Sequence, residues 1–236
     1  MFYEGKNRSP VREYQVYGRV FVLVKDPLPE NINLFSTLEK IEKSIPNYLL
    51  HDLDSIYIGQ FEEFIERDIN AFYRDGAIFA TNDQIDDSDL MDDLVHEMAH
   101  SVESYYSAQI YGDGEIEQEF LGKRRRLLDL LAQHELDIDL RDKSLRDLFF
   151  DLKYSQKFDN MLYKDIGYAL LSNITRGLFC NAYAATSLRE YFASGFEEFY
   201  MADRQYLKKI SPAVFEKLQY LNNLNEEWCH TSLFLS

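Results

Sequence analysis

Hydrophobic and polar positions in the first third of the chain follow the patterns of strands and of a helix in turn. Runs rich in β-branched and aromatic residues predict strands, whereas leucine and isoleucine at helical spacing in residues 33–43 predict a helix. Asp75 and Gly76 are residues of a tight hairpin turn, so residues 71–81 are expected to form a pair of strands. The remaining strands are expected at residues 13–24 and 55–58.

From residue 86 onward the apolar positions change to helical spacing. Asp86 and Ser88 are typical of a helix N-terminal cap, and their acidic neighbours favour the positive end of the helix dipole. The helix that begins there is expected to end at Gly112. Further helices are expected at residues 115–133, 144–152, 159–171, 188–202 and 212–221. The pattern therefore predicts an α+β fold with a small N-terminal mixed sheet and a helical C-terminal half.

The domain organisation is inferred from the absence of linkers and repeats in the sequence. No linker rich in Gly, Ser or Pro divides the 236 residues, and no internal repeat is visible. A chain of this length suits one large domain, so a single domain spanning residues 1–236 is expected. It would consist of a mainly α/β part (1–85), one long helix (86–112) and a helical remainder (113–236).

The charge of the chain excludes some classes of partner. Lys and Arg number 25 against 41 Asp and Glu, which gives a formal net charge of −16. Such a protein is repelled by nucleic-acid phosphates and by anionic membranes, so neither is an expected partner. The basic run from Lys123 to Arg126 is interpreted as a solvated helix face.

Targeting signals and cysteines bear on the compartment. No apolar run approaches the ~20 residues that cross a bilayer, and residues 1–10 lack the pattern of a secretory signal. Cys180 and Cys229 are too few for a disulfide framework and are expected to be reduced, half-buried thiols. A cytoplasmic location is the default expectation, and secretion by another route stays open.

Residues 96–100 (HEMAH) form an H-E-x-x-H motif inside the helix expected at residues 86–112. Residues four apart lie on one helix face, so His96 and His100 can bind the same metal ion. Glu97 would project beside that ion, where it can take a proton from a water molecule. The motif predicts a catalytic zinc site, which needs a third protein ligand and one open position.

Histidine is not the expected third ligand. Ser, Val and Glu follow His100, so the extended motif with another histidine six residues later is absent. His51 and His230 have no motif around them, and His134 is expected at the surface. A carboxylate from a later helix is therefore expected to complete the site.

The best carboxylate candidate lies in the helix expected at residues 188–202. Glu190 precedes a strongly apolar helix face, where Ala193 and Gly195 permit close helix packing. The alternatives are Glu197 and Glu198, which by periodicity are expected to face solvent. The residues alone leave this choice open.

A family resemblance bears on the choice. Four parts of the chain together resemble the catalytic domain of anthrax-lethal-factor-type zinc metalloproteases. They are the segment HEMAHSVESYY, Tyr183, the segment EYFASGF at residues 190–196 and the segment LKKISPAVFEKLQYLN at residues 207–222. The clostridial Pro-Pro endopeptidases are similar to it as well. The resemblance covers roughly residues 76–223 and implies a zincin-like metalloprotease fold with one zinc ion.

The resemblance also implies roles for five residues of this chain. The two histidines and a glutamate that opens the later helix would bind zinc, and the motif glutamate would be the general base. A tyrosine seven residues before the third ligand would lie in the active site. The positions are His96, His100 and Glu190 for the metal, and Glu97 and Tyr183 for catalysis.

The chain departs from the family pattern at two places. The family often has a second acid four residues after the ligand glutamate, where this chain has Ser194. Such partners orient zinc ligands. The segment between His100 and Glu190 is also longer than in compact members, and the extra length is assigned to a helical insert at residues 113–157. Residues 158–236 then form the helical C-terminal part.

Three functional hypotheses follow. The first is a zinc endopeptidase that hydrolyses peptides or proteins, with Glu97 as the base and Tyr183 assisting the oxyanion or the leaving group. The alternative is a catalytically silent zinc-binding or interaction module on the same fold. The third is a helical protein with a chance motif.

A strand before the motif helix is a candidate for substrate binding. It resembles the edge strand along which zinc proteases align a peptide by β-augmentation. An ordinary edge or central strand is the alternative. Its residues are Ala77, Ile78, Phe79 and Ala80.

Overall fold

The computed structural model shows a mixed α+β protein. The described residues are 12–67, 69–134 and 142–232, and side chains are described from residue 13 to residue 224 within them. Helices take up the larger share, and the strands form one small mixed sheet. The predicted α+β class is therefore confirmed.

The chain divides into two compact units, Met1–Ser101 and Val102–Ser236. The described strands belong to the first unit, and the second unit is mainly helical. Helix α3 (Asp87–Tyr111) contains the point of division. The single-domain interpretation of the sequence stays a prediction.

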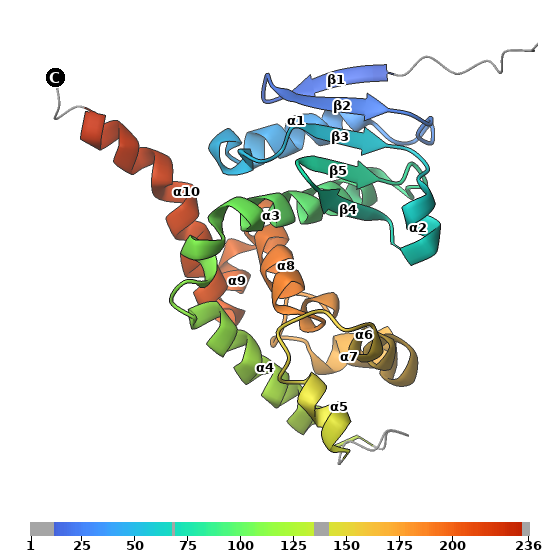
Figure 1. Ribbon diagram of the computed structural model, residues 1–236, viewed down its shortest axis with the longest axis vertical. Helices are drawn as coiled ribbons and strands as arrows, with labels where there is room; N and C mark the ends of the chain where they lie inside the picture. Colours follow the sequence, from blue (N-terminus) through green and yellow to red (C-terminus); the bar gives the residue numbers. More distant parts are fainter. Residues whose placement is uncertain (1–11, 68, 135–141, 233–236) are drawn as a thin grey trace, which may run out of the picture. The chain divides into compact units, whose positions relative to one another are not determined.

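Within the described residues, five strands form a sheet in the order β1-β2-β3-β5-β4 (Figure 1). The three inner strands run parallel, and the two outer strands each pair antiparallel with their neighbour. The bounds are Arg12–Val16 for β1, Val20–Val24 for β2, Ser55–Ile58 for β3, Ala71–Arg74 for β4 and Ala77–Ala80 for β5.

Aliphatic side chains line one face of this sheet. Val22 on β2, Ile56 on β3 and Ile78 on β5 are neighbours across the strands, and all three are fully buried. Partly exposed residues such as Tyr57 and Phe79 alternate with them. A period of two is typical of a sheet with one face in the core. It explains why β3 lies at the residues that the sequence predicts.

The hairpin between β4 and β5 is also confirmed. Asp75 and Gly76 both have positive φ angles, 49° and 82°. Two consecutive residues with positive φ match the primed turns that join antiparallel strands, and Asp-Gly is a favoured pair for them.

Residues 13–24 form two strands instead of the one that was expected. Tyr17 and Gly18 adopt positive φ angles, 55° and 67°, and reverse the chain so that β1 and β2 pair with each other. The backbone N–H of Tyr17 donates to Glu42 Oε1 (2.7 Å), and its hydroxyl donates to the Ile41 carbonyl (3.1 Å). Contacts with a later helix therefore stabilise this turn, and the local residue pattern does not reveal them.

The helices of the first unit follow the sequence in part. Helix α1 (Leu34–Ser44) begins at the Asn33 cap, whose side chain accepts from the Ser36 N–H. The structure adds a short 3₁₀-helix (Asn47–Leu50) and helix α2 (Glu62–Arg67), neither of which was predicted.

The helices of the second unit are more numerous than expected. The region predicted at 159–171 is divided into three pieces, and α9 was not predicted. The bounds are α4 (Glu115–Leu131), α5 (Lys143–Leu148), α6 (Gln156–Asn160), a π-helix (Met161–Gly167), α7 (Tyr168–Ile174), a 3₁₀-helix (Tyr183–Ala185), α8 (Leu188–Met201), α9 (Arg204–Ile210) and α10 (Pro212–Ser232).

The interpretation of the basic run as a solvated face is wrong for two of its four residues. Lys123 is buried and donates to the Ile210 carbonyl (2.5 Å) and to Ser211 Oγ (3.2 Å). Arg124 is fully buried and donates to backbone carbonyls. Arg125 and Arg126 are exposed, as expected. The charged groups of Lys123 and Arg124 thus form hydrogen bonds in the interior of the protein and do not face solvent.

Among the described residues, no helix is both long enough and apolar enough to cross a membrane.

Candidate metal centre

The motif helix α3 is fixed at its start and along one side. The backbone N–H groups of Ser88 and Asp89 donate to Asp86 Oδ1 at 2.8 and 3.0 Å, which caps the helix as the sequence predicts. Leu94 and Met98 are fully buried on the apolar side of the helix. The start of the helix is therefore capped, and its apolar side lies in the core.

The two motif histidines lie one turn apart on α3. The ring centroids of His96 and His100 are 5.0 Å apart, and the rings are nearly perpendicular at 82°. His100 is buried and His96 is half-buried. This is the arrangement that a spacing of four residues predicts for two ligands of one ion.

Glu190 lies in the first turn of α8. Ser187 caps this helix, and its hydroxyl accepts from the Glu190 N–H at 3.3 Å. The Leu188 N–H donates to the Leu152 carbonyl at 2.9 Å, which fixes the entry to the helix. The position of Glu190 is therefore set by hydrogen bonds on both sides of the cap.

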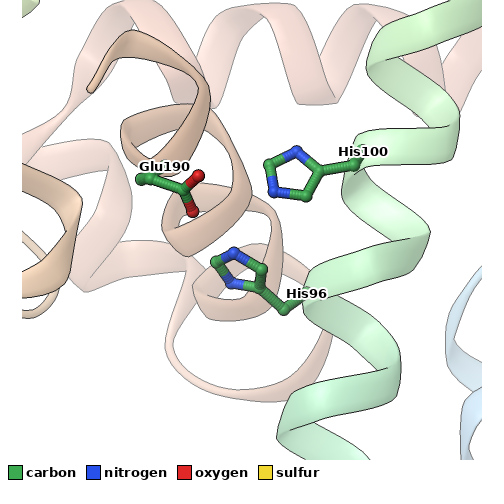
Figure 2. Close-up of side chains that lie close together, drawn as sticks. All are labelled: His96, His100 and Glu190. Carbon is green, nitrogen blue, oxygen red and sulfur yellow. The ribbon is translucent and has the colours of Figure 1, made fainter. Parts of the chain in front are cut away.

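The structure brings these three side chains together (Figure 2). One ligand-type atom from each of His96, His100 and Glu190 lies within 4.8 Å of the others. Figure 2 shows the carboxylate of Glu190 pointing toward the two imidazole rings. This group could hold a metal ion.

The alternative ligands do not join this group. Glu197 and Glu198 are half-buried farther along α8, whereas His51 and His134 are exposed. Within the described part of the chain, none of these four belongs to the ligand group. The side chain of His230 lies outside the described residues, as does that of Cys229.

Glu97, the predicted base, is buried on α3. Asp93, one turn earlier, accepts a hydrogen bond from Gln84 Nε2 at 2.9 Å. Burial raises the pKa of Asp93 to about 6, and the negative charges of Asp89 and Glu97 add to this effect. The motif thus lies in an acidic, partly desolvated environment in which a bound cation would be stabilised.

Tyr183 lies in the 3₁₀-helix before α8 and is 37% exposed. Burial of its hydroxyl raises its pKa above the ordinary value, and the charges of Glu190 and Asp159 raise it further. The hydroxyl therefore stays protonated at neutral pH and can donate a hydrogen bond. Its electrostatic interaction with Glu190 is consistent with the predicted role near the site.

Ser194 is buried on α8, where the resembled family often has an acid. Its hydroxyl donates to Asn181 Oδ1 at 3.3 Å, and the same oxygen accepts from the Ala184 N–H at 2.8 Å. Ser194 therefore contributes to the packing of the segment before α8 and brings no negative charge.

The predicted edge strand is not an edge strand. Strand β5, formed by Ala77, Ile78, Phe79 and Ala80, pairs with β3 on one side and with β4 on the other. Its backbone groups are used in these ladders, so it cannot align a peptide by β-augmentation. At this end of the described sheet, β4 is the outer strand.

A further group near the motif was missed at the sequence level. Glu103 accepts hydrogen bonds from Tyr111 and Arg189. One signal was available, because Glu103 follows His100 by one helical turn. Its partner Arg189 is 86 residues away in sequence, so no local pattern indicates the pairing.

Comparisons with known proteins do not place the chain in a family. No protein-family model matches it, and no curated protein or solved structure is significantly similar. The function is therefore inferred from the residues and from their geometry.

Proposed function

We propose that this protein is a zinc-dependent endopeptidase. The observation that carries the proposal is the convergence of His96, His100 and Glu190 from two helices that are distant in sequence. Two imidazole nitrogens and one carboxylate oxygen are the ligand set of many catalytic zinc sites. Glu97, which occupies the second position of the motif, gives the group a base as well as ligands.

The donor set fits zinc in geometry and chemistry. Zinc bonds of about 2.0–2.2 Å place the ligand atoms of a tetrahedral ion about 3.4 Å apart. The three ligand atoms lie within 4.8 Å of one another, so small side-chain rotations suffice to bind one ion. Imidazole and carboxylate ligands also suit other transition metals, so metal analysis belongs to the test.

The proposed reaction assigns a task to each residue. A bound zinc ion would supply the Lewis acidity that makes water nucleophilic at neutral pH. Glu97 takes the proton of the attacking water and delivers it to the leaving amine. Tyr183, whose hydroxyl is protonated at neutral pH, donates a hydrogen bond to the oxyanion or to the leaving group. The substrate is a peptide or a protein.

The test separates metal binding from turnover. Purified wild type is expected to bind one zinc ion and to cleave members of a peptide library. Glu97→Gln is expected to keep zinc and to lose cleavage by about 10²–10⁴-fold, because a positioned base contributes that much. Glu190→Ala is expected to weaken zinc binding, and Glu197→Ala is the matched control on the same helix.

Each outcome has a distinct meaning. Zinc binding without cleavage in wild type would favour the alternative, a catalytically silent zinc-binding or interaction module. Absence of stoichiometric metal, after zinc is supplied, would contradict the proposal and leave a chance motif. Cleavage that survives in Glu97→Gln would assign the base to another residue.

A further inference from the structure

Glu103 is a buried carboxylate with two donors. It is 6% exposed and lies on α3, one turn after His100. Its Oε1 accepts from the Tyr111 hydroxyl at 2.6 Å, and its Oε2 accepts from Arg189 Nε at 2.7 Å. Hydrogen bonds of this length that involve a charged group are among the stronger ones in proteins.

The ion pair joins two helices at positions next to metal ligands. Arg189 directly precedes Glu190 in the first turn of α8. The backbone between His100 and Glu103 is helical, and the non-helical residue of α3 comes later, at Tyr106. The bond from Arg189 to Glu103 therefore fixes the first turn of α8 against the turn of α3 that follows His100.

The charges support the same arrangement. The positive charge of Arg189 interacts with the negative charges of Glu103 and of Glu190, so one guanidinium lies within electrostatic reach of both carboxylates.

We propose that Glu103 and Arg189 are positioning residues that hold Glu190 in the geometry required for metal binding. They act through α8 and are not ligands themselves. Tyr111 completes the group, because its hydroxyl occupies the second oxygen of Glu103 and limits the orientation of the carboxylate. The inference rests on the metal centre proposed above and adds to it a pair outside the H-E-x-x-H motif.

The test measures zinc affinity and the stability of the metal-free protein side by side. Arg189→Met removes the guanidinium from a side chain that is 61% exposed, so the core is left in place. Lys217→Met is the control, because Lys217 also forms an ion pair in the second unit, with Asp113, and none of the ligand residues takes part in that pair. Zinc affinity is determined by competition with a chromophoric chelator, and stability by thermal unfolding.

Arg189→Met is expected to weaken zinc binding by about 10–100-fold, the usual effect of losing a residue that orients a ligand. Lys217→Met is expected to change it by less than about twofold, since independent sites do not couple. Arg189→Lys keeps the charge but not the Nε donor, and is expected to recover only part of the affinity. Glu103→Gln combined with Arg189→Met should weaken binding by less than the product of the single effects.

The outcomes distinguish this inference from the proposed function. Zinc binding by wild type with unchanged affinity in Arg189→Met would overturn the inference and leave the endopeptidase proposal in place. Equal losses of unfolding temperature and affinity in both methionine variants would also overturn it, because they indicate a structural role alone. No zinc binding by wild type would overturn both.

Discussion

The sheet and helix α4 use buried positions in different ways. The inner strands bury Val22, Ile56 and Ile78, which interact through apolar contacts. Helix α4 buries Lys123 and Arg124 on the same stripe as its apolar residues. In the sheet, burial removes apolar surface from water. In α4, two buried cations bind the carbonyl groups of other segments, so the charge itself organises the surrounding chain.

The difference matters for the candidate site because of where those carbonyls lie. Arg124 donates to the carbonyl of Thr186, the residue before the Ser187 cap of α8. It also donates to the carbonyl of Leu148 at the end of α5. Arg124 therefore ties the segment that leads to Glu190 to the segment after α4. The contribution of each cation to the free energy of unfolding can be measured by replacing one residue at a time.

The largest effect is expected for Arg124→Met. The change leaves the carbonyls of Leu148, Asp151 and Thr186 without their buried donor. At about 1 kcal/mol or more for each lost partner, the free energy of unfolding should fall by about 3 kcal/mol. Urea unfolding followed by circular dichroism measures it. A loss below about 1 kcal/mol, the range of an ordinary substitution, would contradict the idea that the charge organises this region.

Lys123 is expected to make stability depend on pH. Burial lowers the pKa of Lys123 to about 8, although the charge of Glu119 opposes the shift. Between pH 8 and about 10.5 the unfolded chain therefore binds a proton that the folded chain has lost, so the contribution of this lysine to stability rises with pH. Below pH 8 both states are protonated and the cost of burying the charge is at its full value.

The measurement compares wild type with Lys123→Met at two pH values. From pH 7 to pH 10, the free energy of unfolding of wild type should increase relative to the variant by about 2–3 kcal/mol. Tyrosine titrations common to both proteins cancel in the difference. A difference that stays constant with pH would show that the lysine keeps its ordinary pKa in the fold.

The same contrast explains how far the sequence predicts the fold. The strands β3, β4 and β5 were predicted because alternation and an Asp-Gly turn are local signals. The stripe of α4 was also present in the sequence, because Lys123 and Arg124 occupy helical positions between Phe120 and Leu127. Because four basic residues follow one another, the sequence pattern did not show which two of them lie on the buried stripe of α4. The turn at Tyr17 was missed because its partners are on α1.

The candidate site divides in a similar way. His96, Glu97 and His100 follow from one local motif, and Glu190 could be chosen from the apolar face beside it and from a family resemblance. The pairing of Glu103 with Arg189 could not be predicted in this way, because the two residues are 86 positions apart in the sequence. Local periodicity predicts which face of a helix is buried, but it does not predict which charged residue, distant in sequence, will contact that face.

In the sheet, Ile78→Val is expected to change the free energy of unfolding by less than the effects predicted above for Arg124 and Lys123 of α4. Ile78 is fully buried on β5, and losing one methylene group there should lower the free energy of unfolding by about 0.5–1.5 kcal/mol. The effect should be the same at pH 7 and pH 10, because no charged group is involved. Parallel unfolding curves at the two pH values check this, and a pH-dependent cost would mean that the sheet also depends on a titrating group.

The smallest effect is expected for Arg126→Met, two residues after Arg124 on the same helix. Arg126 is exposed, and an exposed substitution away from special features changes stability by less than about 0.5 kcal/mol. The pair of variants Arg124→Met and Arg126→Met keeps residue type, helix and net charge change the same, so only burial differs between them. The urea unfolding midpoints of the two variants provide the measurement. Similar losses in both would assign the effect to the net charge of the chain, whereas a loss confined to Arg124→Met would assign it to the carbonyls that this one side chain binds.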